Sequence, residues 1–163
     1  MPETLYRPYT AADEDSVLAH ILSIQQGEFG VAVTAEEQPD LRAVRETYQS
    51  GTGGFWVAER DGHIVGTIGL IGFGDHQGAL RKMFVAAEVR GREHGVGAKL
   101  LAMLVDHARA QGIKAITLGT IERLKAACRF YVKNGFLPVA PGDLPAGFPR
   151  MPVDTLFFTL SLD

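Results

Sequence analysis

Short apolar runs along the chain predict a β-sheet. The runs Phe55–Glu59 and Ile64–Ile71 are rich in apolar and β-branched residues and flank Arg60-Asp61-Gly62-His63, which is typical of a β-hairpin. Other runs of the same character predict strands over residues 4–9, 79–85, 113–120, 136–139 and 155–162. These seven segments are enough for one open sheet.

Helical periodicity appears between these runs. From Gly97 onward, apolar residues recur at i, i+3, i+4, i+7, i+8 and i+11, which is one face of a helix expected to begin near Gly95 and to end at Gly112. A further helix is expected over residues 123–134, where Gly135 ends it. Both glycines mark the place where the chain turns toward the next strand.

Two helical segments are expected near the N-terminus. Acidic residues at 13–15 favour the positive end of the first helix. Thr34 followed by Glu37 resembles a capping box for a second segment that reaches about Gln49 and is interrupted at Pro39. The resulting order, β-α-α-β-β-β-α-β-α-β-β, predicts a mixed α/β fold in a single domain over residues 1–163.

Composition narrows the class of protein. The 163 residues are 46% apolar and 21% charged, as in a soluble globular domain, and the net charge of −3 gives no general attraction to nucleic acid. The five histidines show no metal-ligand spacing, and the single cysteine excludes an internal disulfide. No leader and no apolar run of about 20 residues is visible, so we expect a cytoplasmic protein without a metal or a membrane anchor.

The segment Arg90-Gly91-Arg92-Glu93-His94-Gly95-Val96-Gly97 has the character of an anion site. It joins a strand to the start of a long helix, where free backbone N–H groups and the helix dipole favour negative charge. Glycines let a phosphate approach the backbone, and the arginines add charge-assisted hydrogen bonds. The alternative is a tight turn with solvated arginines; it leaves the coincidence of glycine, charge and helix start unexplained.

At this segment the sequence resembles the GNAT superfamily of N-acetyltransferases. Residues 92–97 satisfy the family's pyrophosphate motif, Arg or Gln, two residues, Gly, one residue, then Gly or Ala. A second match, Ala127-Cys128-Arg129-Phe130-Tyr131-Val132-Lys133-Asn134-Gly135-Phe136, is similar to the family's Ala-x-x-Leu/Phe-Tyr-x-x-x-Gly-Phe. The resemblance extends over about residues 4–162 and is specific over 78–136. It implies a mostly antiparallel, splayed sheet flanked by helices.

The resemblance also implies a cofactor, acetyl-CoA, as acyl donor. The expected contacts are the backbones of Met83, Phe84 and Val85 with the pantetheine arm, and the residues 90 and 92–97 with the pyrophosphate: Arg90, Arg92, Glu93, His94, Gly95, Val96 and Gly97. Many relatives have Arg-Gly directly before Gly-x-Gly, whereas here two more residues intervene. Arg92 is therefore preferred by spacing as the phosphate arginine, with Arg90 as an outer contact.

A second departure from the family pattern concerns Leu124, which stands where many members carry an asparagine that helps to hold the pantetheine arm. The resemblance therefore predicts that this contact is missing here.

The resemblance assigns Tyr131 as the general acid. A phenol can protonate the CoA thiolate that leaves during acyl transfer, although by helical pattern alone Tyr131 would be a core aromatic. Cys128 is interpreted as a packed thiol, because no histidine lies near it in sequence and the family transfers the acyl group directly.

The acceptor amine must lose a proton before it attacks, and a carboxylate acting through water is the usual solution. Three carboxylates are candidates for this base. Glu122 lies just beyond a strand that would border the acceptor site, and Glu28 lies in a loop that shapes this pocket in relatives. Glu93 is the third candidate. Phe29, in the same loop as Glu28, is a candidate for lining the pocket.

The sequence therefore predicts an enzyme that transfers acetyl from acetyl-CoA to a primary amine of a small molecule or peptide. A non-catalytic CoA-binding module of the same fold is the alternative. A P-loop or dinucleotide site is excluded by the missing Gly-Lys-Ser/Thr and Gly-x-Gly-x-x-Gly. The acceptor stays open among small amines, amino acids, peptides and antibiotics, and so does the formation of a homodimer.

Overall fold

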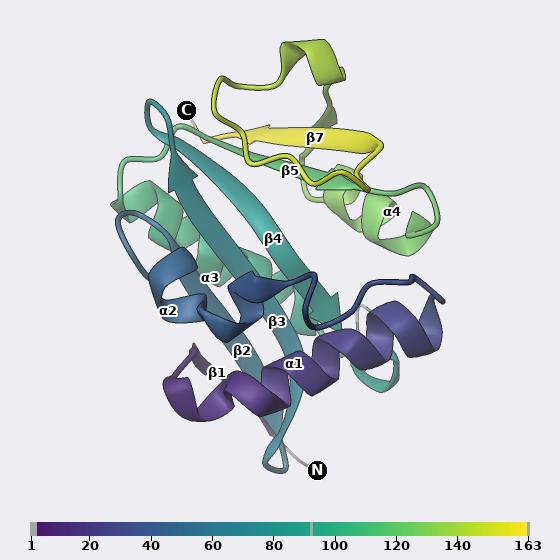
Figure 1. Cartoon of the computed structure of the whole chain (residues 1–163). Coiled ribbons are helices and arrows are strands. Elements are labelled where there is room, and N and C mark those ends of the chain that lie inside the picture. The colour runs from purple at the N-terminus through teal and green to yellow at the C-terminus, as the bar shows by residue number, and fades with distance from the viewer. Residues whose placement is uncertain (1–2, 92, 163) are drawn as a thin grey trace.

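The computed structural model describes residues 3–91 and 93–162 (Figure 1). Its described residues form a seven-stranded sheet in the order β1-β2-β3-β4-β5-β7-β6. Neighbouring strands are antiparallel except for β4 and β5, which run parallel. The bounds are β1 Thr4–Pro8, β2 Gly54–Arg60, β3 His63–Phe73, β4 Gln77–Val85, β5 Ala115–Thr120, β6 Leu137–Pro138 and β7 Leu156–Ser161. This mixed, mostly antiparallel sheet confirms the predicted fold class.

The hairpin of β2 and β3 forms where the sequence predicted it. Its two-residue turn, Asp61-Gly62, has φ angles of +53° and +77°, the left-handed conformation that suits the twist of two antiparallel strands. Glycine adopts this conformation without steric cost, and aspartate tolerates it better than most residues.

The longer helices also lie where periodicity placed them. They are α1 Glu14–Leu22, α3 Val96–Ala110 and α4 Lys125–Lys133. A π-helical segment, η2 Ser23–Glu28, continues α1, and 3₁₀ turns cover Ala11–Asp13, Ala87–Val89 and Pro141–Asp143.

The second helical segment is shorter than the sequence suggested. It consists of a 3₁₀ turn, η3 Pro39–Arg42, and a four-residue helix, α2 Val44–Thr47. The reciprocal bonds of Thr34 and Glu37 do form, with Thr34 N donating to Glu37 Oε1 at 3.1 Å and Glu37 N donating to Thr34 Oγ1 at 3.3 Å. Pro39 offers no N–H to continue a helix, so the chain turns instead.

Two hydrophobic clusters cover the two faces of the sheet. In Figure 1, α1 and α2 lie in front of the strands and α3 lies behind them. Leu41 and Tyr48, fully buried, belong to the cluster under α1 and α2, whereas Leu100 and Leu104, also fully buried, belong to the cluster under α3. The sheet is thus the middle layer of a three-layer domain.

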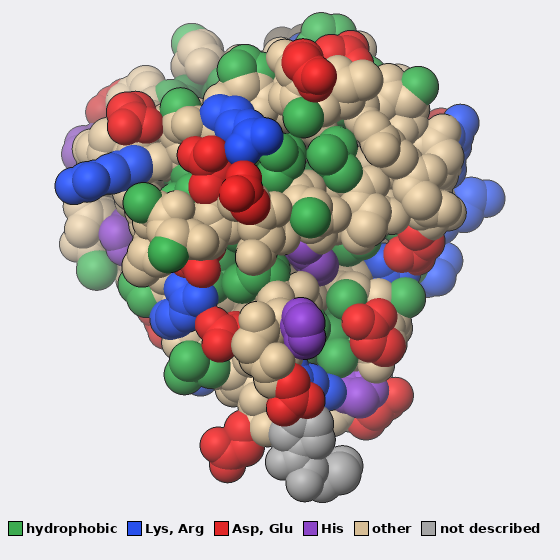
Figure 2. All heavy atoms as spheres, turned by 60° about the horizontal axis from the view of Figure 1, so that its bottom comes forward, with side chains coloured by type: hydrophobic (Ala, Val, Ile, Leu, Met, Phe, Trp, Pro, Cys, Tyr) green, Lys and Arg blue, Asp and Glu red, His purple; other side chains and the backbone are tan. Residues whose placement is uncertain are grey.

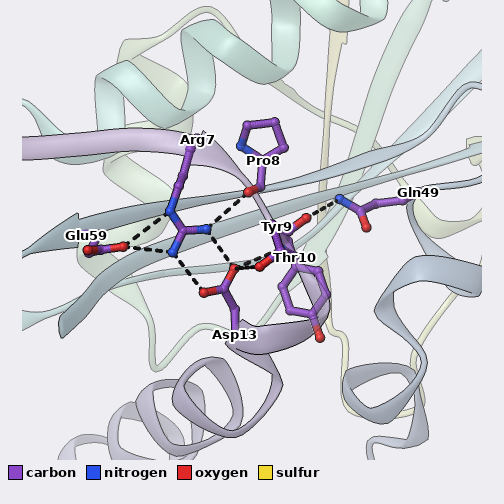
Figure 3. A network of polar contacts seen from close by, with 7 residues as sticks. All are labelled: Arg7, Pro8, Tyr9, Thr10, Asp13, Gln49 and Glu59. Carbon is purple, nitrogen blue, oxygen red and sulfur yellow. Dashed lines mark hydrogen bonds and ion pairs between the residues drawn. The ribbon is translucent and has the colours of Figure 1, made fainter. Parts of the chain in front are cut away.

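A polar network fixes the N-terminal strand (Figure 3). The Arg7 guanidinium donates to both carboxylate oxygens of Asp13, at 2.7 and 2.8 Å, and to Glu59 Oε1 at 2.8 Å. Thr10 N donates to Asp13 Oδ2 at 2.8 Å, and Gln49 Nε2 donates to the Tyr9 carbonyl at 2.9 Å. These bonds hold the start of α1 against the edge strand β1.

Charges of both signs are mixed on one face of the molecule. On the face drawn in Figure 2, basic and acidic side chains alternate with hydrophobic ones rather than forming a field of one sign. No described helix is both long enough and apolar enough to cross a bilayer.

Candidate functional site

The parallel strands β4 and β5 diverge, and this divergence creates the site. They are paired only at Gln77, Gly78 and Ala79 of β4, opposite residues 115–117. Beyond Ala79 the two strands separate, as Figure 1 shows. The rest of β4, through Val85, therefore has no partner strand on that side, and two cavities open between β4 and the unit of β5 and α4.

The larger of the two, the main cleft, has a volume of about 650 Å³. One wall is the end of β4 and the start of α3, and the other is α4 together with the turn before it. Its lining includes Met83, Phe84, Val85, Arg90, Gly91, Gly95, Gly97, Arg123, Leu124, Lys125, Phe130, Tyr131 and Lys133. Most of the cofactor residues expected from sequence therefore meet in one cavity.

The start of α3 offers free backbone donors to this cleft. Gly95 is the residue before the helix and has φ +65°, and the first intrahelical bond runs from Lys99 N to the Gly95 carbonyl at 3.0 Å. The N–H groups of Val96, Gly97 and Ala98 therefore have no acceptor within the helix. Such a helix start binds anions.

The remaining residues of the motif divide between core and solvent. The side chain of Val96 is fully buried in the α3 cluster, so it can serve the cleft only through its backbone. Glu93 and His94 are exposed and do not line the cleft. Arg92 lies outside the described residues.

Arg90 lines the main cleft and is held by three groups. Its Nε donates to the Val85 carbonyl at 2.7 Å, and its two terminal nitrogens donate to the two carboxylate oxygens of Glu28, one of them at 2.6 Å. Its guanidinium also lies 5.6 Å from the centre of the Phe29 ring. Arg90 thus connects η2 to the loop that precedes α3.

Three further basic side chains line the main cleft from the opposite wall, and the sequence reasoning missed them. Arg123, Lys125 and Lys133 come from α4 and the turn that precedes it. No carboxylate is among the described residues that line this cleft. The cleft therefore suits a ligand with several negative charges.

A β-bulge shapes the open part of β4. Thr67 of β3 pairs with Phe84 of β4, and Gly69 pairs with Arg81. Between these two pairs β3 has one residue and β4 has two. Lys82 is one of these two residues of β4 and has φ +55°. Its carbonyl accepts a hydrogen bond from Thr67 Oγ1 at 2.8 Å. Bulges of this kind redirect backbone groups next to active sites.

Tyr131 lies where the two cavities meet, because it lines both. Its side chain is 6% exposed and its ring contacts the rings of Phe130, Phe136 and Phe158. Burial, with a smaller contribution from Cys128, raises the pKa of Tyr131 well above its ordinary value of 10. The phenol therefore keeps its proton at neutral pH.

Cys128 is a half-buried residue that packs against the α3 cluster. Burial raises the pKa of its thiol, and its Sγ lies 3.9 Å from the Ile121 carbonyl oxygen. A thiol held in its neutral form is a poor nucleophile, in agreement with a packing role.

The second cavity, the small cavity, has a volume of about 350 Å³ and lies on the other side of Tyr131. Its walls come from η2 and residues 31–38, from β4, from the end of β5, from α4 and from residues 148–154. Its charged lining residues are Glu37, Arg81, Lys82 and Asp154. The two cavities share Phe29, Met83, Phe84, Leu124, Ala127 and Tyr131 as lining residues, so they lie next to each other.

Lys82 is one of these charged residues, and its side chain is only 8% exposed. Its Nζ donates to Gln38 Oε1 and lies 3.8 Å from Asp40 Oδ2, and Asp40 accepts a 2.5 Å hydrogen bond from the Tyr48 hydroxyl. Burial lowers the pKa of Lys82, and Asp40 opposes this. A lysine at an inward strand position was the sequence signal that could have revealed this cluster.

The two proposed bases and Phe29 are placed differently by the fold. Phe29 lines both cavities. Glu28 is paired with Arg90 and lines neither of the two, and Glu122 is exposed and lines neither. Within residues 3–91 and 93–162 no cluster of side chains suitable for a metal ion is found.

Comparison with known proteins agrees with this geometry. A sequence profile described as the acetyltransferase (GNAT) family matches residues 11–136. A crystal structure of a GNAT-family acetyltransferase from Staphylococcus aureus Mu50 is 36% identical, covers 99% of this chain and 100% of its own, and superposes with a TM-score of 0.94.

More distant relatives share part of the chain or only the fold. The probable N-acetyltransferase camello of Xenopus tropicalis is 33% identical over 60% of this chain, which spans only 45% of that relative's length. The N-acetylglutamate synthase of Neisseria gonorrhoeae, solved with coenzyme A and N-acetyl-glutamate, is 17% identical and covers 99% of this chain and 35% of its own, with a TM-score of 0.73. This last likeness concerns the fold alone.

Proposed function

Because the chain belongs to the GNAT acetyltransferase family, we propose that it transfers an acetyl group from acetyl-CoA to a primary amine. The observation that carries the proposal is the pair of cavities on the open side of β4, which share Tyr131 as a wall. One cavity would hold the acyl donor and the other the acceptor. Holding two reactants next to each other in this way can supply a large part of the rate enhancement.

The main cleft would bind the CoA part of the donor. The free amides of Val96, Gly97 and Ala98 and the basic groups of Lys125 and Lys133 would meet the phosphates. We propose that Arg92 is the main phosphate arginine and Arg90 an outer contact, because Arg90 already has a carboxylate partner in Glu28.

The open edge of β4 would bind the pantetheine arm, in the way that an added strand binds to a sheet edge. Met83, Phe84 and Val85 line the main cleft and have no partner strand on that side. The carbonyls of Phe84 and Val85 are already bonded to His20 Nε2 and Arg90 Nε. The acetyl group would then lie beside the bulge at Lys82, where a strand amide can stabilise the negative charge that develops on the thioester oxygen.

Tyr131 would protonate the departing thiolate. Its burial between both cavities and its raised pKa keep the proton available at neutral pH. The amine attacks the thioester carbon, the C–S bond breaks, and the sulfur takes the electron pair and the phenolic proton. The nitrogen loses one proton as the amide forms, and one proton restores the phenol. Acetylated amine and free CoA are the products.

The test is release of free thiol from acetyl-CoA with a panel of polyamines, amino acids, peptides, aminoglycosides and arylalkylamines. Tyr131→Phe should lower kcat by about 10²-fold or more and change the Kd of CoA little, because the phenol acts on the leaving group. Equal losses in kcat and in CoA affinity would make Tyr131 a packing residue. Saturable binding of acetyl-CoA without thiol release from any amine would favour the non-catalytic module.

A further inference from the structure

Asp154 places a carboxylate in the small cavity that the sequence did not single out. The residue ends the long loop before β7, and the next residue, Thr155, donates its N–H to the Thr120 carbonyl at 2.9 Å. This bond fixes Asp154 beside the end of β5. A methyl group added at Gly119 would overlap the Asp154 carboxylate, so the side chain lies directly over that strand.

The Asp154 carboxylate has no ionic partner among the described residues. Its Oδ2 accepts one weak hydrogen bond, from Met151 N at 3.3 Å, and no described Lys, Arg or His nitrogen lies within 4.0 Å. The charged groups that act on it are Arg81 and Lys82 of β4 and Arg150 of its own loop. It therefore retains most of its capacity to accept hydrogen bonds from a ligand.

Together, the surroundings of Asp154 raise the pKa of its carboxyl group. Burial raises the pKa of Asp154 and outweighs the Met151 amide and the three cations, which lower it. The positive charges of Arg81, Lys82 and Arg150 favour the ionised form. A carboxylate with a raised pKa is a better proton acceptor than a solvated one.

The other carboxylates near the site are engaged or outside it. Glu28 is paired with Arg90, and Asp40 with Lys82 and Tyr48. Glu37 lines the cavity but is exposed and accepts hydrogen bonds from Thr34.

We propose that Asp154 is the proton acceptor for the amine, acting directly or through one water; this rests on the proposed acetyl transfer. The carboxylate takes one proton from the acceptor ammonium, and the freed lone pair forms the C–N bond as the C–S bond breaks. The nitrogen then loses a second proton, which balances the one that the thiolate receives through Tyr131. Asp154 later releases its proton to solvent, so the net reaction yields amide, free CoA and one proton.

The first test compares Asp154→Asn with Asp143→Asn, which removes an exposed carboxylate from the same loop. With the alkylamine of highest turnover in the panel, Asp154→Asn should lower kcat/KM at pH 7 by about 10²-fold to 10⁴-fold. Asp143→Asn should leave it within about twofold. The Kd of CoA and the Tm of both variants identify any loss that comes from misfolding.

The second test is the pH profile of kcat/KM. In the wild type, kcat/KM should fall toward acid as Asp154 is protonated. In Asp154→Asn this limb should be replaced by a rise that continues up to the pKa of the acceptor amine, because only the free amine then reacts. Hydroxylamine, which is unprotonated at neutral pH, should be a substrate for which the variant loses much less. A wild-type profile without an acid limb would overturn the proposal even if Asp154→Asn does not fold.

The outcomes separate the two proposals. If no amine releases CoA from the wild type, the proposed function fails. If the wild type is active and Asp154→Asn keeps its rate and its acid limb, Asp154 is not the proton acceptor. In that case, loss of the acid limb of the kcat/KM profile in a Glu122→Gln variant would identify Glu122 as the proton acceptor.

Discussion

His20 shows how a single residue connects the first helix with the strand that carries the site. It lies on α1, is buried, and its Nε2 is 3.0 Å from the Phe84 carbonyl oxygen of β4. Burial lowers the pKa of His20, and the hydrogen bond to Phe84 only partly opposes this. The ring is therefore neutral in the folded protein at neutral pH.

This placement predicts a pH dependence of stability. Because the folded pKa of His20 lies below the ordinary value of 6.5, the unfolded chain binds more protons as pH falls through that value, and stability is lost there. Above it, both states are neutral and nothing is lost. We expect His20→Gln to flatten the decline in Tm between pH 7 and pH 5.

The matched control is His63→Gln, which removes an exposed histidine from the β2–β3 hairpin. It should leave the wild-type pH dependence unchanged, as measured by thermal unfolding at each pH. If His20→Gln and the wild type lost the same stability on acidification, His20 would not be the titrating group.

At the scale of elements, the junction between β4 and α3 combines a conformational demand with the chemistry of the site. Gly95 holds φ +65° directly before the helix, and Gly91 holds φ +107° at the start of the same turn. These angles let the chain turn so that the first amides of α3 point toward the main cleft. The same glycines that fit the motif in the sequence are thus required by the backbone.

The left-handed conformation of Gly95 leads to a stability prediction. Gly95→Ala should destabilise the fold by about 1–2 kcal/mol, the cost of placing a Cβ in that conformation. This corresponds to a fall in Tm of about 2–8 °C for a protein of this size.

Gly142→Ala is the control, because a Cβ at Gly142 meets no atom within 4 Å and its φ is not positive. It should leave Tm unchanged in the same thermal scan. An unchanged Tm in Gly95→Ala would mean that the turn adopts another conformation in solution.

At the scale of the whole molecule, one sheet joins two hydrophobic clusters. Leu41 is fully buried on the α1 and α2 side, and Leu104 is fully buried on the α3 side. The chain has one tryptophan, Trp56, which lies in the α3 cluster with its ring 5.0 Å from the His107 ring. Its fluorescence therefore reports on one face only.

If the chain unfolds as one cooperative domain, the two hydrophobic clusters lose their structure together. Leu41→Ala and Leu104→Ala should each lower the free energy of unfolding by about 2–5 kcal/mol, because each leaves a cavity in a packed core. In urea, Trp56 fluorescence and far-UV circular dichroism should give one midpoint in each variant. A Leu41→Ala variant whose fluorescence midpoint stayed at the wild-type value would show that the faces unfold separately.

The sequence alone determined the elements and the family, because their signals are local. Helical and strand periodicity, Asp61-Gly62 in the hairpin turn, and glycines with adjacent arginines before α3 depend on neighbouring residues only. Pro39 shortens the second helical segment. The sequence predicted an interruption at this proline but not how short the remaining helix would be. The two family motifs were readable for the same local reason, since each is contained in a single strand-to-helix turn or helix.

Only the tertiary structure decided which charged groups face the site. Glu28 forms an ion pair with Arg90, 62 residues away, and the Lys82 ammonium lies 3.8 Å from the Asp40 carboxylate. Asp154 lies in a loop without periodicity and reaches the cavity because Thr155 is bonded to β5. Burial and pairing of a charge depend on residues distant in sequence, so the availability of a carboxylate as a base is a property of the fold.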